Sequence, residues 1–292
     1  MDGGLSNELE RQGCNLNHKL WSAKMVDANP EVIIIAHLSY LRAGARCITT
    51  ASYQASVPGF MDLGYSREVT EQFIAKTVEL AEEAIRRFRK EGSKDEVFIA
   101  ASVGPYGAYL ADGSEYRGRY GVSHDELLSF HKDRIQLLDK TGAHFFACET
   151  MPDFQEVKVL AEILKHTKKR AWITFSCKDE KHLNDGTPIA ECAAYLLDHP
   201  NVFALGVNCT APQHISGLIS ELKANAGNKK IVIYPNSGEV YHADTKTWLG
   251  LSDPDAFATM TQQWLSQGVD IIGGCCRIGP EHINKMSDAL SA

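Results

Sequence analysis

Apolar segments of strand length alternate with amphipathic segments of helical length along the whole chain, and this alternation constrains the fold most strongly. Short runs rich in β-branched and aromatic residues indicate strands, and apolar residues spaced by three or four indicate helices. After a stub at Met1, we expect strands over residues 46–51, 97–103, 144–149, 171–177, 202–209, 230–234 and 269–275. Such alternation predicts a parallel sheet covered by helices.

Helix start signals follow several of these strands. Ser123 with Glu126 and Asp153 with Glu156 have the spacing of N-terminal caps, and Thr187 precedes a proline suited to the first helical position. We expect helices over residues 29–43, 67–90, 123–141, 212–226 and 254–267, and others beginning at 153, 187 and 280. Residues 104–121 form a long loop rich in glycine and tyrosine, and a loop of this length without its own structure is typical of a functional lid.

Counting the stub, the chain contains eight strand–helix units with no linker between them. Eight units in this length predict a single (β/α)8 TIM barrel over residues 1–292. Its first strand is expected to be truncated, because Met1 directly precedes Asp2-Gly3-Gly4. A doubly wound open sheet is the alternative, although no Gly-x-Gly-x-x-Gly follows the first strand. In a barrel, the loops that follow the strands would form the active face.

Composition narrows the class of protein. The formal net charge is −7, with 30 basic and 37 acidic residues, and no basic block is present. Nucleic acid and anionic membranes are therefore not expected partners. No apolar run approaches the roughly 20 residues that span a bilayer, and no signal peptide opens the chain, so we expect a cytoplasmic protein. In that reducing compartment the eight cysteines are expected to be thiols or metal ligands, not disulfides.

Three cysteines fall at the ends of expected strands. Cys209 ends the strand at 202–209, and Cys275 and Cys276 follow Gly273-Gly274 at the end of the last strand. Since the two strands would flank a common neighbour, we expect the three thiols to bind one zinc ion per chain. Three protein ligands leave one tetrahedral position open, which is typical of a catalytic site. The alternative is core packing, the role expected for four of the five other cysteines, at positions 14, 47, 177 and 192.

The ligand set indicates the chemistry. Zinc held by three thiolates carries net negative charge and activates water poorly, but it can bind a substrate thiolate and lower the pKa of that thiol. Transfer of an alkyl group to the bound sulfur is the natural reaction. No His-Glu-x-x-His occurs, so metallopeptidase chemistry is disfavoured.

Five motifs, taken together and in order, resemble the zinc-dependent homocysteine S-methyltransferases. They are Asp2-Gly3-Gly4, Cys148-Glu149-Thr150, Gly206-Val207-Asn208-Cys209, Tyr234-Pro235-Asn236-Ser237-Gly238-Glu239 and Gly273-Gly274-Cys275-Cys276-Arg277. Two further segments, residues 102–110 and 112–118, look most like the branch that uses S-methylmethionine or S-adenosylmethionine. The resemblance implies methyl transfer from such a sulfonium donor to homocysteine, giving methionine.

The resemblance also implies roles for single residues. Asp2 and Glu149 would bind the homocysteine ammonium group, and the backbone of Gly3 and Gly4 would receive its carboxylate. The donor cation would meet tyrosine faces, with candidates at Tyr53, Tyr106, Tyr109 and Tyr116. Asn208 and Asn236 would orient substrate or hold loops in place.

Two alternatives remain open. The chain could be a betaine-dependent or other thiol or selenol methyltransferase of the same family, or an inactive zinc-binding barrel relic. A cobalamin route is disfavoured, because the chain leaves no room for the additional domains it would require. The sequence leaves the preferred donor and the oligomeric state open.

Overall fold

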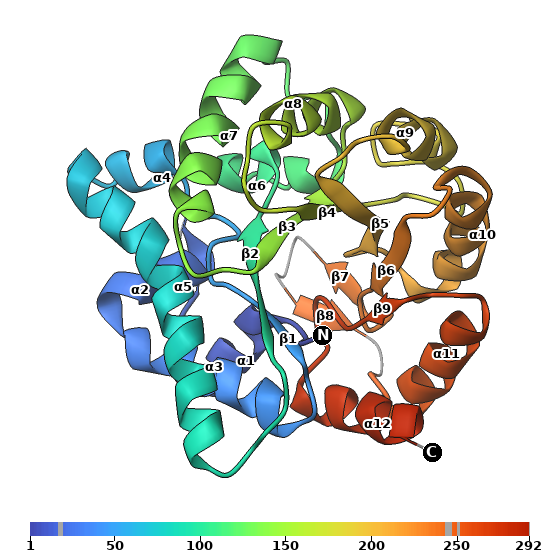
Figure 1. Cartoon of the computed structure of the whole chain (residues 1–292), viewed down its shortest axis with the longest axis horizontal. Helices are drawn as coiled ribbons and strands as arrows, with labels where there is room; N and C mark the ends of the chain where they lie inside the picture. Colours follow the sequence, from blue (N-terminus) through green and yellow to red (C-terminus); the bar gives the residue numbers. More distant parts are fainter. Residues whose placement is uncertain (17–19, 243–246, 250–251, 292) are drawn as a thin grey trace.

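The computed structural model describes residues 1–16, 20–242, 247–249 and 252–291. Seven parallel strands form one curled sheet in the order β1-β2-β3-β4-β5-β6-β9. Their bounds are β1 (Cys47–Thr49), β2 (Phe98–Val103), β3 (Phe145–Met151), β4 (Ala171–Phe175), β5 (Val202–Asn208), β6 (Lys230–Tyr234) and β9 (Ile271–Ile272). Each lies within a segment expected to be a strand or within two residues of it. Figure 1 shows the strands curling around the centre of the molecule with the helices outside them.

The long helices were also expected. They are α3 (Pro30–Arg42), α5 (Arg67–Lys90), α7 (His124–Asp139), α8 (Phe154–Leu164), α9 (Ile189–Leu196), α10 (Ile215–Asn225), α11 (Pro254–Ser266) and α12 (Pro280–Ser291). The capping box of Ser123 and Glu126 is confirmed, as is the cap at Asp153. Thr187 does not cap α9: its hydroxyl and amide donate to the Asp185 carboxylate in the preceding turn.

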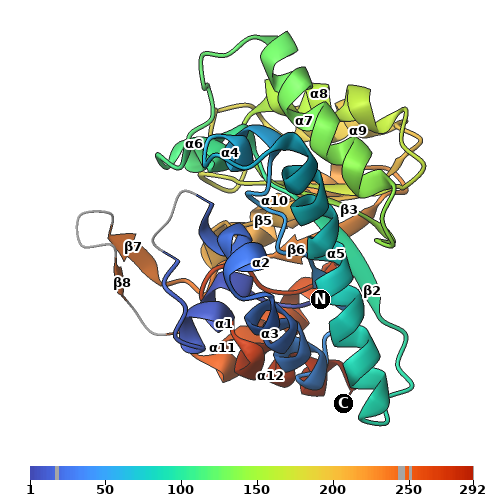
Figure 2. The same ribbon diagram turned by 90° about the vertical axis from the view of Figure 1, so that its left-hand side faces the viewer.

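Several short elements were not expected from the sequence. They are α1 (Leu5–Arg11), α2 (Met25–Ala28), α4 (Val57–Met61), α6 (Tyr106–Leu110), the hairpin strands β7 (Val240–His242) and β8 (Thr247–Leu249), and the 3₁₀ segments Trp21–Lys24, Ser114–Tyr116 and Pro212–His214. The expectation of a loop without its own structure over residues 104–121 is therefore wrong. A helix of one or two turns is too short to show a period in the sequence. Figure 2 shows the β7–β8 hairpin standing out from the body.

Among the described residues the sheet has seven strands, not the expected eight. The main chain of Met1 and Asp2 links its two edges instead. The Asp2 amide donates to Cys47 O at 2.9 Å, and Gly274 N donates to Asp2 O at 3.0 Å. The Met1 nitrogen lies 2.5 Å from Ile272 O. These two residues therefore sit between β9 and β1, where Figure 1 marks the N-terminus.

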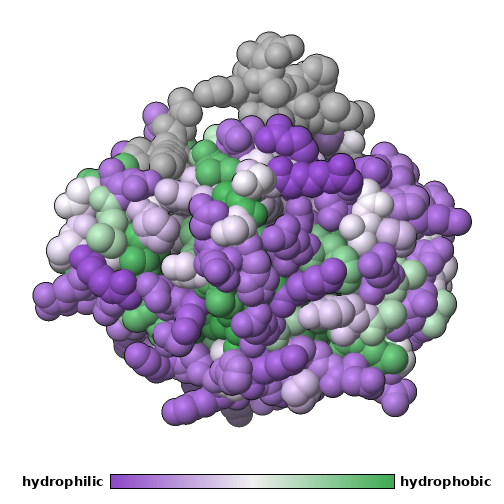
Figure 3. All heavy atoms as spheres, turned by 90° about the horizontal axis from the view of Figure 1, so that it is seen from above, coloured by the Kyte–Doolittle hydropathy of each residue, from purple (hydrophilic) through white to green (hydrophobic). Residues whose placement is uncertain are grey.

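Two apolar cores lie on the two faces of the sheet. The larger one packs the helices against the outside of the sheet. The smaller one fills the inside with mostly small side chains around Trp172 and Tyr234, and Met1 packs against it. The face in Figure 3 is covered mainly by hydrophilic residues, with apolar residues in separate patches between them. Within the described residues, no helix has both the length and the apolar character needed to cross a membrane.

Candidate active site

A pocket that is partly open to solvent lies where the parallel strands end. Residues from both ends of the chain and from the loops after β1, β2, β3, β5 and β9 line it. The expected site residues in its lining are Asp2, Gly3, Gly4, Tyr53, Tyr116, Glu149, Asn208, Cys209, Cys275 and Cys276. No lysine, arginine or histidine side chain is among the described residues that line it.

The three expected zinc ligands meet at this pocket. The sulfur atoms of Cys209, Cys275 and Cys276 all lie within 4.8 Å of one another. The Cys209 and Cys276 sulfurs are 4.0 Å apart. Tetrahedral zinc with bonds of about 2.3 Å places its sulfur ligands roughly 3.8 Å apart. The spacing of Cys209 and Cys276 therefore fits a shared zinc ion, and all three side chains fit it in chemical type.

The same proximity brings two of these thiols together as a disulfide. Cys209 and Cys275 are joined in this structure, with Cα atoms 5.6 Å apart. The expectation that no cysteines pair is therefore wrong, because thiols close enough to share one metal are also close enough to bond. The other six cysteines are free: those at 47, 148, 177 and 192 are buried, and Cys14 and Cys276 are half-buried.

The backbone turns sharply at the strand ends that carry the site. Thr150 has φ +63°, Cys209 has φ +46° and Arg277 has φ +66°. Left-handed backbone is uncommon for residues other than glycine, and it is a clear outlier for a β-branched threonine. Such conformations persist where surrounding contacts hold them, and they cluster at functional sites. The three residues follow or end strands β3, β5 and β9.

Asn208 holds two of these turns together. Its side-chain oxygen accepts hydrogen bonds from Thr150 N at 2.6 Å and Thr174 Oγ1 at 2.7 Å. Its amide nitrogen donates to Thr150 Oγ1 at 2.7 Å and lies 3.9 Å from Cys275 Sγ. Of the two roles considered for Asn208, these bonds correspond to holding loops in place.

Two buried carboxylates with neutral partners lie in the pocket. Asp2 accepts from Thr49 N at 2.7 Å and from the Thr49 hydroxyl. Glu149 accepts from the hydroxyl of Ser102 and is also bonded to that of Tyr234. Burial raises the pKa of Asp2 and that of Glu149 to about 7 each. A cation that binds between these groups would restore their ionised forms.

Gly3 and Gly4 lie against the segment of residues 275–278, which carries two of the candidate metal ligands. A Cβ atom at Gly3 would lie 2.3 Å from Ile278 O, and one at Gly4 would lie 2.7 Å from Cys275 O. The Gly4 amide donates to Ile278 O at 2.9 Å, so it is not free to receive a substrate carboxylate as expected. Close packing explains the glycines.

The expected aromatic and amide residues divide into two groups. Tyr53 and Tyr116 line the pocket. Tyr106 and Tyr109 do not; they pack against each other and against Phe130. Asn236 also lies outside the lining, and its side-chain oxygen is buried with no hydrogen-bond partner within the described residues. We therefore keep only Tyr53 and Tyr116 as candidates for contact with the donor.

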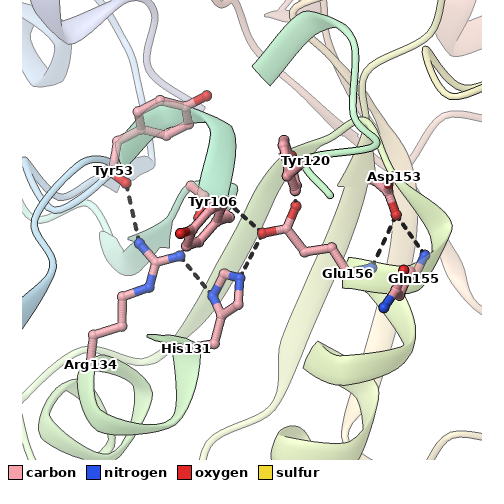
Figure 4. A network of polar contacts seen from close by, with 9 residues as sticks. Tyr53, Tyr106, Tyr120, His131, Arg134, Asp153, Gln155 and Glu156 are labelled. Carbon is pink, nitrogen blue, oxygen red and sulfur yellow. Dashed lines mark hydrogen bonds and ion pairs between the residues drawn. The ribbon is translucent and has the colours of Figure 1, made fainter. Parts of the chain in front are cut away.

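A buried polar network supports the wall of the pocket (Figure 4). His131 Nε2 lies 2.7 Å from Glu156 Oε1, and Arg134 Nη2 lies 2.8 Å from His131 Nδ1. Because arginine only donates, Nδ1 accepts and the Nε2 hydrogen goes to Glu156. Burial lowers the pKa of His131 to about 4, which keeps the ring neutral. Arg134 also donates to the main-chain oxygens of Gly104 and Tyr53, and so holds two pocket loops.

One carboxylate of the pocket lining was not selected from the sequence. Glu115 lines the pocket beside Tyr116, on the 3₁₀ segment Ser114–Tyr116. It belongs to the segment 112–118 that contributed to the family resemblance. A carboxylate next to a tyrosine in that segment was the available signal.

Comparison with known proteins agrees with this site. The family model for homocysteine S-methyltransferase matches residues 1–290. Homocysteine S-methyltransferase YbgG of Bacillus subtilis is 47% identical over 292 residues, covering 98% of this chain and 92% of that protein.

Solved structures of the homocysteine methyltransferase MmuM from Escherichia coli are also similar. Its metallated form has a TM-score of 0.89 at 41% identity, covering 99% of this chain and 94% of that one. Its oxidised form has a TM-score of 0.89 at 42% identity, covering 98% of this chain and 94% of that one. With matches of this extent to its sequence and its fold, the chain belongs to the homocysteine S-methyltransferase family, and it is an enzyme that transfers a methyl group to homocysteine.

Proposed function

We propose that the methyl donor is S-methylmethionine or S-adenosylmethionine, and that Cys209, Cys275 and Cys276 hold one zinc ion when all three are reduced. The observation that carries this proposal is the meeting of three sulfur atoms within 4.8 Å at a pocket whose charged side chains are carboxylates. Zinc, when bound, supplies positive charge that favours the thiolate of homocysteine over its thiol.

The acceptor is held by the carboxylates of the pocket. Asp2 and Glu149 receive the homocysteine ammonium group. Its positive charge compensates the ionised carboxylates, which burial alone disfavours. In this arrangement the amino acid end of homocysteine lies at these carboxylates and its sulfur lies at the cysteines.

The reaction is a displacement at the methyl carbon. The homocysteine sulfur, as a thiolate, forms a bond to the methyl group while the bond from methyl to the donor sulfur breaks. The electron pair of the broken bond stays on the donor sulfur, which becomes a neutral thioether, and the thiol proton of homocysteine leaves to solvent. With S-methylmethionine both products are methionine. The enzyme contributes mainly by holding the two sulfurs and the methyl group in line.

We also propose that residues 1–292 form a single (β/α)8 barrel in which Met1 and Asp2 take the place of a strand between β9 and β1. Their main-chain hydrogen bonds to both edge strands support this arrangement. The similarity to MmuM over nearly the whole chain supports it as well.

The donor is tested by turnover of homocysteine with S-methylmethionine, S-adenosylmethionine and betaine at matched concentrations under reducing conditions. We expect S-methylmethionine or S-adenosylmethionine to give the fastest turnover, and a metal chelator to abolish it until zinc is restored. Faster turnover with betaine would assign the enzyme to a betaine-using branch.

The zinc ligands are tested by metal analysis of the reduced protein. We expect about one zinc per chain in wild type and in Cys14→Ser, and strong loss in Cys209→Ala and Cys276→Ser. Cys14 is a suitable control because it is a free, half-buried cysteine outside the cluster. Full zinc retention in Cys276→Ser would show that this residue is not a ligand.

A further inference from the structure

Glu115 is a pocket carboxylate to which the reaction described above gives no role. Its side chain lines the pocket together with Tyr53, Tyr116 and Cys276. Its Oε2 atom is buried and has no hydrogen-bond partner in the described structure. An unpaired buried carboxylate oxygen loses the solvation it would have in water, and proteins rarely retain one without a function.

The turn that carries Glu115 is closely packed and fixed by hydrogen bonds. Gly113 adopts φ +81°, and Asp112 Oδ1 accepts from Ser114 N at 2.9 Å. A Cβ atom at Gly107 would lie 2.4 Å from Glu115 N, so helix α6 lies directly against this turn. Its hydrogen bonds and close packing therefore hold Glu115 at the pocket.

The charges of the pocket separate into two groups. Asp2 and Glu149 lie close enough for the Glu149 carboxylate to raise the pKa of Asp2, although burial is the larger cause. Glu115 in turn contributes to raising the pKa of Tyr53, again after burial. Asp2 and Glu149 thus act on each other, while Glu115 is the carboxylate with the largest effect on Tyr53, which lines the same pocket.

The substrates carry more positive charge than Asp2 and Glu149 account for. Homocysteine brings an ammonium group, which these two carboxylates receive. S-methylmethionine and S-adenosylmethionine each bring an ammonium group of their own and, at the reacting centre, a sulfonium cation. Glu115 is the one further carboxylate in the described lining of the pocket. Tyrosine faces at Tyr53 and Tyr116 are suited to the methyl groups around such a cation.

We propose that Glu115 binds the positively charged sulfur of the methyl donor and so selects a cationic donor over the neutral thioether product. This inference rests on the proposed function. After methyl transfer the donor sulfur is neutral, so its attraction to Glu115 is lost and the product is released more readily.

The expected change in KM and kcat follows from the stage of the reaction at which the donor sulfur is charged. The sulfonium charge is complete in the bound substrate and is fading in the transition state, so Glu115 stabilises the substrate complex more than the transition state. Loss of the carboxylate should therefore raise KM for the donor without lowering kcat. A residue that only supports the fold would change both substrates' KM or lower kcat.

The test compares wild type, Glu115→Gln and Asp125→Asn, using whichever of S-methylmethionine, S-adenosylmethionine and betaine wild type turns over fastest. Asp125 is a matched charge control, since its side chain is 97% exposed at the start of α7. We expect Glu115→Gln to raise KM for the donor by roughly thirty-fold, as for removal of one partner of a desolvated charge pair. In Glu115→Gln, KM for homocysteine and kcat should change by less than about two-fold. In Asp125→Asn, all three kinetic constants should change by less than about two-fold.

Binding gives a second readout. The ratio of the dissociation constants of methionine and S-methylmethionine, which differ by one methyl group and one charge, should fall by a similar factor in Glu115→Gln. Glu115→Asp, which keeps the charge on a shorter side chain, should recover part of the donor affinity.

Three results would overturn the assignment. An unchanged donor KM in Glu115→Gln would do so, as would an equal rise of KM for both substrates together with a lower melting temperature. In both cases turnover of a sulfonium donor by wild type would leave the proposed function standing. If wild type turned over none of the three cationic donors, the proposed function and this assignment would both be wrong.

Discussion

Glu149 and Glu156 are both buried glutamates, one near the end of β3 and one in the first turn of α8, yet their surroundings differ. Glu149 has only hydroxyl donors, from Ser102 and Tyr234. Glu156 accepts hydrogen bonds from the ring of His131, from Tyr120 OH at 2.9 Å and from Tyr106 N at 2.5 Å. Arg134 donates to the other ring nitrogen of that histidine.

The difference separates a carboxylate whose charge is compensated within the fold from one that we propose binds the substrate ammonium group. Around Glu156 the protein itself supplies hydrogen bonds and a nearby cation, so the charge is compensated without substrate. Around Glu149 the described pocket lining offers no basic side chain, and burial raises the pKa instead. A buried carboxylate without a nearby cation lowers the stability of the ligand-free protein, and it gains an opposite charge when a cationic ligand binds.

The largest expected effect is on stability in the network. Glu156→Gln removes the charge that compensates buried Arg134, so we expect the free energy of unfolding to fall by about 3 kcal/mol. The same substitution at Glu149 should change it by less than about 1 kcal/mol at pH 8, or raise it. Urea unfolding of the two variants measures this directly. Equal destabilisation by both would remove the distinction between the two sites.

The next effect is the pH dependence of stability. Glu149 has a pKa of about 7 in the folded protein against 4.5 as its ordinary value. Between these values the folded state holds a proton that the unfolded state has lost, so stability falls as pH rises through this window and levels off above it. We therefore expect Glu149→Gln to gain about 2 kcal/mol relative to wild type between pH 5 and pH 8. A constant difference across that range would contradict the raised pKa.

The smallest expected effect is the loss of one hydroxyl in the network. Tyr120→Phe removes the hydrogen bond to Glu156 and should lower the free energy of unfolding by about 1.5 kcal/mol, without changing KM for either substrate. Tyr109→Phe is the control, because its hydroxyl contacts Asp62 at an exposed position. Its unfolding free energy should change by less than about 0.5 kcal/mol. If the two variants had the same free energy of unfolding, the buried hydrogen bond from Tyr120 to Glu156 would contribute no more to stability than the exposed one from Tyr109.

Sequence patterns predict the parts of this molecule that repeat over many residues. The period of apolar positions identifies helix α5 over its full extent, Arg67–Lys90. The strand order β5-β6-β9 follows from the alternation of elements, and it brings Cys209 to the other two thiols. The candidate metal cluster was therefore accessible from sequence because each cysteine lies just after a strand.

Features that depend on side-chain contacts between distant elements were not accessible. The bond between Cys209 and Cys275, the contact of Glu156 with His131 on another helix, and the orphan oxygen of Glu115 all depend on how elements pack. The hairpin of β7 and β8 has strands of three residues, too short for a clear alternation. The hydrogen bond from the Gly4 amide to Ile278 O likewise depends on how distant segments pack.

The most direct test is the thermal stabilisation of these variants by methionine, a product that carries the ammonium group but no thiol. Reduced, zinc-loaded wild type and Glu156→Gln should both melt several degrees higher with saturating methionine, because the ligand binds the folded state. Glu149→Gln should show little or no shift at the same concentration. A full shift in Glu149→Gln, or its loss in Glu156→Gln but not in Glu149→Gln, would contradict the assignment of Glu149 to the ligand and Glu156 to the fold.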